Sequence, residues 1–276
     1  MIGDATVFKV REDRLWLFTA RDSDGEHVSE VARGFDVATR PITDELGCLQ
    51  VQGPGARDLL SAFVPDIADL AYFRFSPEPV GLANVSCWVA RIGYSGEVGY
   101  ELFCASGEAE ALWNALLASG ASPYGLAAAE TLRIEAGLIR LGREYVPHRS
   151  SPYDLSLDEL VCLEKDRFIG KEALQGIATR PPRRLVTTVV GGHVAVPPPG
   201  APISIGGRRI GTVTSSCRSP TFNTVIALGI VDRASAEEGP GVEILPGSEE
   251  LIGTIRPGPM LDWKARRIRF SDAGAD

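Results

Sequence analysis

Beyond about residue 180 the sequence contains no run with the helical period of 3.6 residues. Short apolar runs follow one another there, separated by turns rich in Gly, Pro and Asp. These runs are LVTTVV, APISI, RRIGTVTSS, VIALGIV and GVEIL. Many short strands with such turns indicate a small all-β barrel or sandwich. The basic segment GIATRPPRR comes just before them and predicts a linker.

The part before the linker mixes strands and helices. Five strands are expected, at TVFKV, RLWLFT, GCLQVQ, VSCWVARIGY and YELF. In VSCWVARIGY, Val85, Cys87 and Val89 alternate with a less buried set, as in a strand with two different faces. Helical spacing predicts three helices, in GPGARDLLSAF, EAEALWNALLA and LAAAETLRIEAGL. The apolar stripe of the second includes Trp113, and the third ends at Gly137. The expected fold class is therefore α+β, with antiparallel sheets and flanking helices followed by a small C-terminal all-β barrel.

Composition excludes several classes of protein. The 276 residues suffice for about two domains, and 44% hydrophobic residues allow a sizeable core. The net charge of −8, without a basic stripe, argues against nucleic acid as a partner. No apolar run reaches the roughly 18 residues of a membrane span, and the first residues do not resemble a signal peptide. We therefore expect no membrane partner and a cytoplasmic location.

Cysteine and histidine are too scattered for a metal site. The five cysteines form no C-x-x-C pair, and Cys87 and Cys104 lie in apolar stretches, which favours plain buried thiols over redox or metal roles. The three histidines, His27, His148 and His193, are far apart in the sequence. No metal site is therefore expected.

The stretch RIGYSGEVGYELF, residues 91–103, places glycines at 93, 96 and 99 among tyrosines and glutamates. The spacing and the following strand do not fit a dinucleotide-binding fingerprint, and Glu97 stands where a nucleophile elbow needs glycine. IGKEAL lacks the remaining residues of a phosphate-binding loop. Glycine clusters mark tight turns or close approach to another group. From the residues alone, that group can be the protein itself or a ligand.

Four side chains near the turns are candidates for chemistry, although each also has a purely structural interpretation. Asp4 can be a solvated acid close to the start of the sequence, Tyr94 a ring beside a turn, and Glu101 an exposed strand residue. Arg133 can simply pair with Glu130, three residues earlier on the same helix face.

Four motifs in order resemble the aminomethyltransferase family, the T-protein of the glycine cleavage system and its folate-dependent relatives. They are GYSGEVGYELF, GLAAAETLRIEAGL, DRFIGKEAL and IGTVTSSCRSPTFNTVIALGIVD. The resemblance covers nearly the whole chain. It implies binding of tetrahydrofolate and transfer of a one-carbon unit to the folate N5 from a small-molecule donor or a donor held on a carrier protein.

The resemblance also implies roles for particular residues. Asp4 corresponds to a catalytic aspartate beside the folate nitrogens, and Glu101 to the glutamate that accepts hydrogen bonds from the pterin edge. Tyr94 and Thr6 fall in the same cofactor pocket, and Arg133 corresponds to a ligand-positioning arginine. A carboxylate that accepts two adjacent N–H donors makes a charge-assisted pair, which suits the pterin edge. With this resemblance we interpret the glycines of residues 91–103 as making room for a planar ligand.

The chain also departs from the family pattern. Gly3, Ala20 and Leu141 stand where relatives carry aspartate, asparagine and tyrosine, and relatives extend further before the position of Asp4. The expected domains are 1–45, the remainder of a folate-binding α+β domain; 46–175, a second such domain; and 181–276, the barrel.

Three functional alternatives remain open from the sequence. The first is an enzyme, a tetrahydrofolate-dependent methyl- or aminomethyltransferase. The second is a folate-binding subunit that needs a partner chain to supply the N-terminal part of the family fold. The third is a folate-binding module without catalysis. The identity of the one-carbon donor is open in all three.

Overall fold

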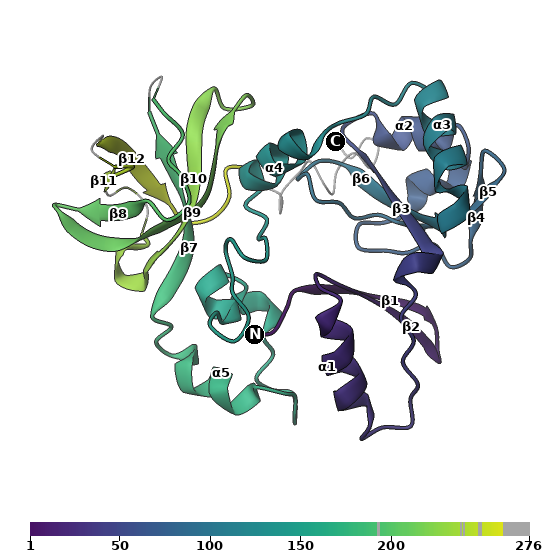
Figure 1. The fold of residues 1–276 in the computed structure, drawn as a ribbon, viewed down its shortest axis with the longest axis horizontal. Helices are drawn as coiled ribbons and strands as arrows, with labels where there is room; N and C mark the ends of the chain where they lie inside the picture. The colour runs from purple at the N-terminus through teal and green to yellow at the C-terminus, as the bar shows by residue number, and fades with distance from the viewer. Residues whose placement is uncertain (192–193, 238, 240, 248–249, 262–276) are drawn as a thin grey trace. The chain divides into compact units, whose positions relative to one another are not determined.

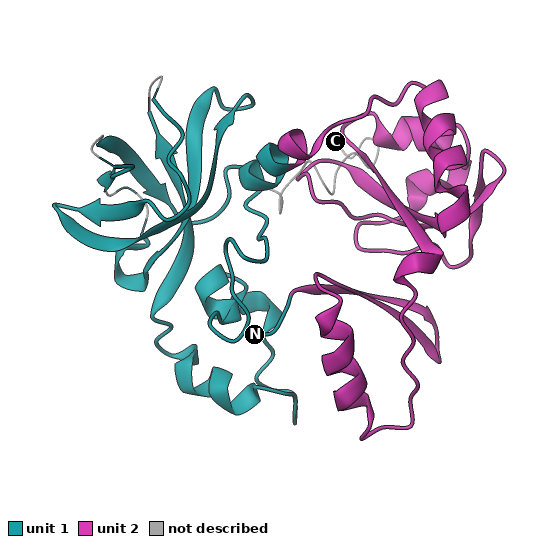
Figure 2. Cartoon of the chain, in the orientation of Figure 1, with its two compact units in different colours: residues 1–3, 130–261 teal, residues 4–129, 262–276 magenta. Residues whose placement is uncertain are grey.

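The computed structural model describes residues 1–191, 194–237, 239, 241–247 and 250–261. These fold as two compact units (Figure 2), unit 1 from residues 1–3 and 130–261 and unit 2 from residues 4–129. His193 and the last residues of the expected barrel domain, 262–276, lie outside the described part of the chain. Within the described part, no helix is long and apolar enough to cross a membrane.

Unit 2 is built on a four-stranded antiparallel sheet with the order β3-β6-β5-β4 (Figure 1). Its strands are β3 (Leu46–Gln52), β4 (Val80–Leu82), β5 (Val85–Ala90) and β6 (Gly99–Ala105). Alternate residues of β5 and β6 point to one face, where they pack against Leu60 of α2 (Ala56–Ser61) and Leu112 of α3 (Ala109–Ala118). This is the larger core of unit 2, and it leaves the opposite face of the sheet free of these helices.

The opposite face of the sheet packs against a β-hairpin through aromatic rings. The hairpin consists of β1 (Ala5–Arg11) and β2 (Arg14–Thr19), and α1 (Ser23–Ala32) follows it. Phe8 is buried and contacts Phe103 of β6, with ring centroids 5.7 Å apart. The other rings of this aromatic cluster are Trp16, Phe18, Phe75 and Trp88. Such ring pairs stabilise by about 0.5–1.5 kcal/mol each beyond the area they bury, so they fix the hairpin on the sheet.

Unit 1 contains a closed barrel with the strand order β10-β7-β12-β11-β8-β9. Its strands are β7 (Arg183–Val190), β8 (Pro202–Ile205), β9 (Arg208–Ser219), β10 (Thr224–Asp232), β11 (Gly241–Ile244) and β12 (Leu251–Arg256). The inward-facing aliphatic side chains fill its interior. Before the barrel come α4 (Leu126–Glu135), of which residues from 130 on belong to unit 1, and α5 (Lys171–Ala178).

Short 3-10 turns complete the two units. In unit 2 they are η1 (Thr43–Glu45), η2 (Pro65–Asp69) and η3 (Ser106–Glu108). In unit 1 they are η4 (Pro152–Leu155), η5 (Asp158–Leu160) and η6 (Arg233–Ser235). Ser151 and Asp154 close the start of η4 with a reciprocal capping box, which fixes the backbone of that segment.

The predicted fold class is confirmed, and the C-terminal part is a barrel rather than a sandwich. Several details differ from the sequence interpretation. Trp113 is 44% exposed, because Leu112 and Leu116 occupy the buried side of α3. Residues 176–178 form the last turn of α5 rather than a linker. The elements β4, α5 and β12 were not predicted. The domain boundaries expected from the sequence stay predictions.

Candidate functional site

Glu101 lies on the face of the unit 2 sheet that carries the aromatic cluster. Along β6, Glu101 and Phe103 point to this face, whereas Tyr100 and Leu102 point into the core under the helices. The register pairs Glu101 with Gln50 of β3 on one side and with Ala90 of β5 on the other. The carboxylate therefore stands between an amide and a small apolar side chain, one step along the strand from an aromatic surface.

The Glu101 carboxylate is half-buried and incompletely satisfied. Its Oε1 accepts a hydrogen bond from Gln50 Nε2 at 2.8 Å, and Gln50 Oε1 accepts one from the Tyr124 hydroxyl at 3.3 Å. Within the described residues, Oε2 of Glu101 accepts no hydrogen bond. Desolvation by burial raises the pKa of Glu101, and the Gln50 hydrogen bond opposes that rise. A desolvated carboxylate with a remaining acceptor atom is suited to bind a ligand with N–H donors.

Two of the three glycines in the 91–103 stretch, Gly93 and Gly99, make room for Gln52, so at these positions our interpretation that the glycines make room for a planar ligand is wrong. A Cβ at Gly93 or Gly99 would lie 2.0 or 2.1 Å from Gln52 Oε1. The same oxygen accepts a hydrogen bond from the Ser95 hydroxyl at 2.7 Å. Gly96 has φ of +74°, which a tight turn in this connection requires. The Gln52 amide thus holds the β5–β6 connection against β3.

Tyr94 lies in this same connection and is half-buried. The backbone around it is fixed at both ends, because Gln52 Nε2 lies 3.4 Å from the carbonyl oxygens of Ile92 and Tyr100. Tyr94 and Glu101 are therefore carried by one ordered strand–turn–strand segment, as the sequence predicts.

Asp4 and Thr6 lie at the start of the hairpin. Burial alternates along β1, with Thr6 half-buried, Val7 exposed and Phe8 buried. Thr6 and Phe8 therefore share the face that packs on β6, and Asp4 precedes Thr6 by the same two-residue step. Asp4 is an exposed residue. Desolvation by neighbouring atoms nevertheless raises the pKa of its carboxyl group, and a hydrogen bond with the Ala5 backbone opposes that rise. The predicted residues Asp4, Thr6, Tyr94 and Glu101 all belong to unit 2.

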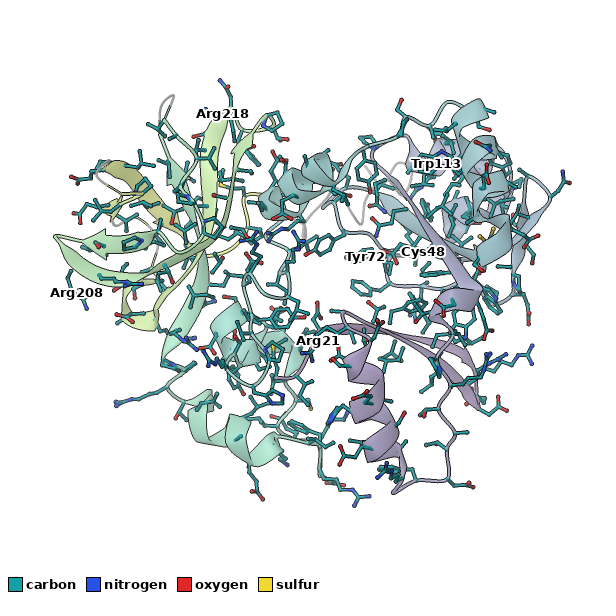
Figure 3. All side chains as sticks on the ribbon, in the orientation of Figure 1. Arg21, Cys48, Tyr72, Trp113, Arg208 and Arg218 are labelled. Carbon is teal, nitrogen blue, oxygen red and sulfur yellow. The ribbon has the colours of Figure 1, made fainter. Side chains whose placement is uncertain are left out.

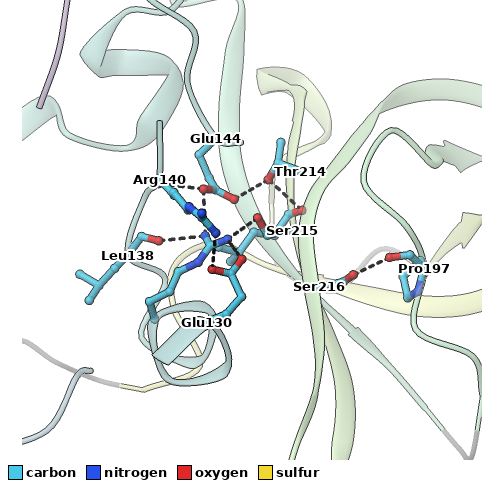
Figure 4. A network of polar contacts seen from close by, with 10 residues as sticks. Glu130, Leu138, Arg140, Glu144, Pro197, Thr214, Ser215 and Ser216 are labelled. Atoms are coloured by element: carbon cyan, nitrogen blue, oxygen red, sulfur yellow. Dashed lines mark hydrogen bonds and ion pairs between the residues drawn. The ribbon is translucent and has the colours of Figure 1, made fainter. Parts of the chain in front are cut away.

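Arg133, the remaining predicted site residue, belongs to unit 1 and is fully buried. Its Nη1 donates to Glu144 Oε2 at 2.9 Å and to the Leu138 carbonyl oxygen at 3.2 Å (Figure 4). Its Nη2 donates to Glu130 and to Ser215 Oγ of β9. The structural alternative, an ion pair with Glu130, is therefore present. The ligand-positioning role of Arg133 stays a prediction.

Cys48 is the nearest thiol to this face and can be followed in Figure 3, where it is labelled on β3. The residue is exposed, in contrast to the buried thiol that the sequence favours, whereas Cys87 and Cys104 are buried as expected. Desolvation of the sulfur atom, with the charges of Glu101 and Cys104, raises the pKa of Cys48 to about 12. The group is therefore a thiol at neutral pH and a poor nucleophile.

Sequence reasoning missed Gln50, Gln52, Ser95 and Tyr124. The alternation of GCLQVQ places Gln50 and Gln52 on one face of a strand, and this was the available signal. It becomes informative only once the pairing of β3 with β6 is known.

Comparisons with known proteins identify the family. The family model described as the GCVT N-terminal domain matches residues 1–165, and the glycine cleavage T-protein C-terminal barrel domain matches residues 183–262. The chain belongs to the glycine cleavage T-protein family. An aminomethyltransferase from Streptomyces avermitilis is 38% identical, and the match covers 91% of this chain and 70% of that one.

Two further relatives of this T-protein family member are informative. A trimethylamine-oxide aldolase from Ruegeria pomeroyi is 38% identical over 98% of this chain, which spans only 36% of the length of that protein. The crystal structure of the glycine cleavage system aminomethyltransferase T from Bartonella henselae matches with a TM-score of 0.82 and 27% identity, over 95% of this chain and 73% of that one. Similar T-protein family members thus carry different named activities.

Proposed function

We propose that this chain is a tetrahydrofolate-dependent transferase that moves a methyl or aminomethyl group from a donor to the folate. The observation that supports this most directly is the half-buried Glu101 carboxylate, which has a raised pKa and an acceptor oxygen left over. It stands in the family motif at the position expected to bind the pterin edge.

The chemistry of the residues fits a reduced folate. A pterin presents adjacent N–H donors on a flat ring, and a carboxylate in a partly desolvated site accepts such donors strongly. Glu101 supplies the carboxylate, two residues along β6 from Phe103, which is itself buried against the hairpin. Tyr94 and Thr6 are the further proposed contacts. The folate, when bound, supplies the acceptor nitrogen for the one-carbon unit.

Asp4 is the proposed catalytic group. An anionic carboxylate at the start of β1 stabilises positive charge that develops on an amine during transfer, and its protonated form can return a proton. The raised pKa of Asp4 brings the ionised and protonated forms of its carboxyl group closer in free energy near neutral pH. A cationic or amine-type donor, either a small molecule or a group on a carrier protein, is the class that such a residue suits.

Titration of tetrahydrofolate into Glu101→Gln by calorimetry tests the binding site. Charge-assisted hydrogen bonds are worth about 1.5–3 kcal/mol, so affinity should fall at least about tenfold. Glu108→Gln is the matched control, because Glu108 lies in the same unit but in the η3 turn rather than on this face. Unchanged affinity in Glu101→Gln contradicts the proposed site.

Turnover of Asp4→Asn tests the catalytic role. The rate of folate-dependent transfer should fall at least about 100-fold, the usual contribution of a positioned acid–base group, while tetrahydrofolate affinity stays within about twofold. Full activity of this variant would exclude Asp4 as the catalytic group.

The proposal of a partner chain rests on the sequence resemblance alone. Turnover of the purified chain by itself, compared with turnover after co-expression with its neighbouring reading frames, separates this alternative from independent activity. Folate binding without turnover under both conditions would instead favour a non-catalytic folate-binding module.

A further inference from the structure

A hollow of about 520 Å³ lies within unit 1, between the segment that follows α4 and the barrel strands β7, β9 and β10. Its volume falls in the range of small-molecule sites. Four of its lining residues are arginines, Arg143, Arg149, Arg183 and Arg209. This concentration of cations stands out in a chain whose net charge is −8.

The acidic residues of the hollow do not neutralise these arginines. Three acids line it, and one of them, Glu144, forms an ion pair at 2.9 Å with Arg133, which is not a lining residue. Asp232 lies 3.9 Å from Arg208, also outside the lining. Among the described residues, the lining acid that pairs with a lining arginine is Asp154, whose Oδ2 lies 3.5 Å from Arg183 Nη2.

Three arginines therefore keep their charge available. Among the residues that the structure describes, the guanidinium groups of Arg143, Arg149 and Arg209 make no ion pair, and all three residues are exposed. Unpaired guanidinium groups around a concave surface repel one another, so their arrangement favours a shared counter-ion.

The wall of the hollow is built rigidly. Arg183 donates to the Arg149 carbonyl oxygen at 3.2 Å, which ties β7 to the segment after α4. Thr214 of β9 donates to Glu144 Oε1 at 3.0 Å and so joins the barrel to the same segment. These contacts fix the backbone that carries Arg149 and Arg183, which lowers the entropy cost of capturing a ligand.

We propose that this hollow binds a small anion that carries two or more negative charges on phosphate or carboxylate groups. The planar guanidinium fork matches both groups with paired hydrogen bonds. The inference goes beyond the folate proposal, because every lining residue belongs to unit 1, whereas Asp4, Tyr94 and Glu101 belong to unit 2.

Calorimetry of the full chain with sodium pyrophosphate tests the proposal. We expect one site, which weakens at least about tenfold in Arg149→Gln/Arg209→Gln and several-fold when NaCl is raised, because salt screens exposed charges. Arg167→Gln is the matched control, an exposed arginine of the same unit outside this hollow, and should change affinity less than about twofold.

A parallel titration with citrate identifies the ligand class. Tighter pyrophosphate binding indicates a phosphoryl ligand, and tighter citrate binding a polycarboxylate. Both results support an anion site if the double variant loses the binding. Absence of binding of either probe at millimolar concentration overturns the proposal, as does equal affinity of the double variant, whose fold is checked by its thermal transition.

Discussion

Two glutamates of this chain, Glu144 in unit 1 and Glu101 in unit 2, have opposite surroundings. Glu144 is fully buried and accepts three hydrogen bonds, from Arg133, from the backbone of Arg140 and from Thr214. Glu101 is half-buried and accepts one hydrogen bond, from Gln50, within the described residues. The first carboxylate has its partners inside the protein, and the second has capacity for a partner from outside.

The number of hydrogen bonds that each carboxylate accepts distinguishes a structural role from a functional one. A buried carboxylate with a cation and several donors is satisfied and stabilises its fold only as long as the whole network is intact. A carboxylate that is desolvated yet short of donors costs folding free energy. Such a cost is typical of sites that bind ligands, which is why we assign Glu101 and not Glu144 to the folate.

Removing Arg133, the cation that pairs with the buried Glu144, should have the largest effect on stability. Arg133→Met leaves Glu144 buried without its counter-charge, so the free energy of unfolding should fall by about 3–5 kcal/mol. Urea denaturation followed by circular dichroism measures this. A loss below about 1 kcal/mol would mean that Arg133 is not a structural residue and would revive its ligand-positioning role.

Inserting a methyl group beside Gln52 should have a smaller effect, confined to unit 2. Gly99→Ala displaces the Gln52 amide and its hydrogen bond with Ser95, at a cost of about 1–2 kcal/mol. In a Gln52→Ala background the same substitution should cost almost nothing. A double-mutant cycle checks the coupling between the two positions. Additive effects would contradict the close packing of Gln52 against Gly99.

The pH dependence of folate binding should reflect the raised pKa of Glu101. The ionised form accepts the pterin donors, so affinity should fall as pH falls through that pKa, by up to tenfold per pH unit. The decline should start at higher pH than for an ordinary glutamate. The free energy of unfolding should change in the opposite direction. Burial favours the neutral Glu101 carboxyl group, so its contribution to stability is lost as pH rises through the raised pKa. Calorimetric titrations at several pH values measure the first effect.

The same titrations on Glu101→Gln are the control for protonation of the ligand itself. This variant should lose the part of the pH dependence that belongs to the protein. An identical pH profile in both proteins would show that Glu101 does not contact the folate.

Removing the exposed ion pair between Arg140 and Glu130 should have the smallest effect on stability. Arg140 is 55% exposed and pairs with Glu130 at 2.9 Å. Because water and salt screen this pair, Arg140→Gln should lower the free energy of unfolding by less than about 1 kcal/mol, and still less at high salt. A loss as large as that of Arg133→Met would remove the distinction between the buried and exposed parts of the network.

Much of the fold could be predicted from local patterns. The alternation of Val85, Cys87 and Val89 identified the buried face of β5, and all three are buried as expected. The two strands of the hairpin and the barrel character of the C-terminal part also followed from short apolar runs and turn residues. β12 (Leu251–Arg256) was missed, because its alternation is interrupted by a glycine at position 253 that sits against Thr188 of a distant strand.

The site could be predicted less completely, because its contacts join residues far apart in the sequence. The pair of Arg133 with Glu130 followed from helix spacing, whereas its contact with Ser215 spans 82 residues. Similarly, the reason for Gly99 is Gln52, and this became visible only through the register of β3 and β6. Local periodicity gives the face on which a side chain lies, but not which partner lies across from it.

The aromatic cluster also equips unit 2 with an optical signal. Two of the chain's four tryptophans, Trp16 of the hairpin and Trp88 of the sheet, stack edge to face with ring centroids 5.6 Å apart. Any event that shifts the hairpin on the sheet changes the environment of both indoles at once. Intrinsic fluorescence therefore follows this interface without a label.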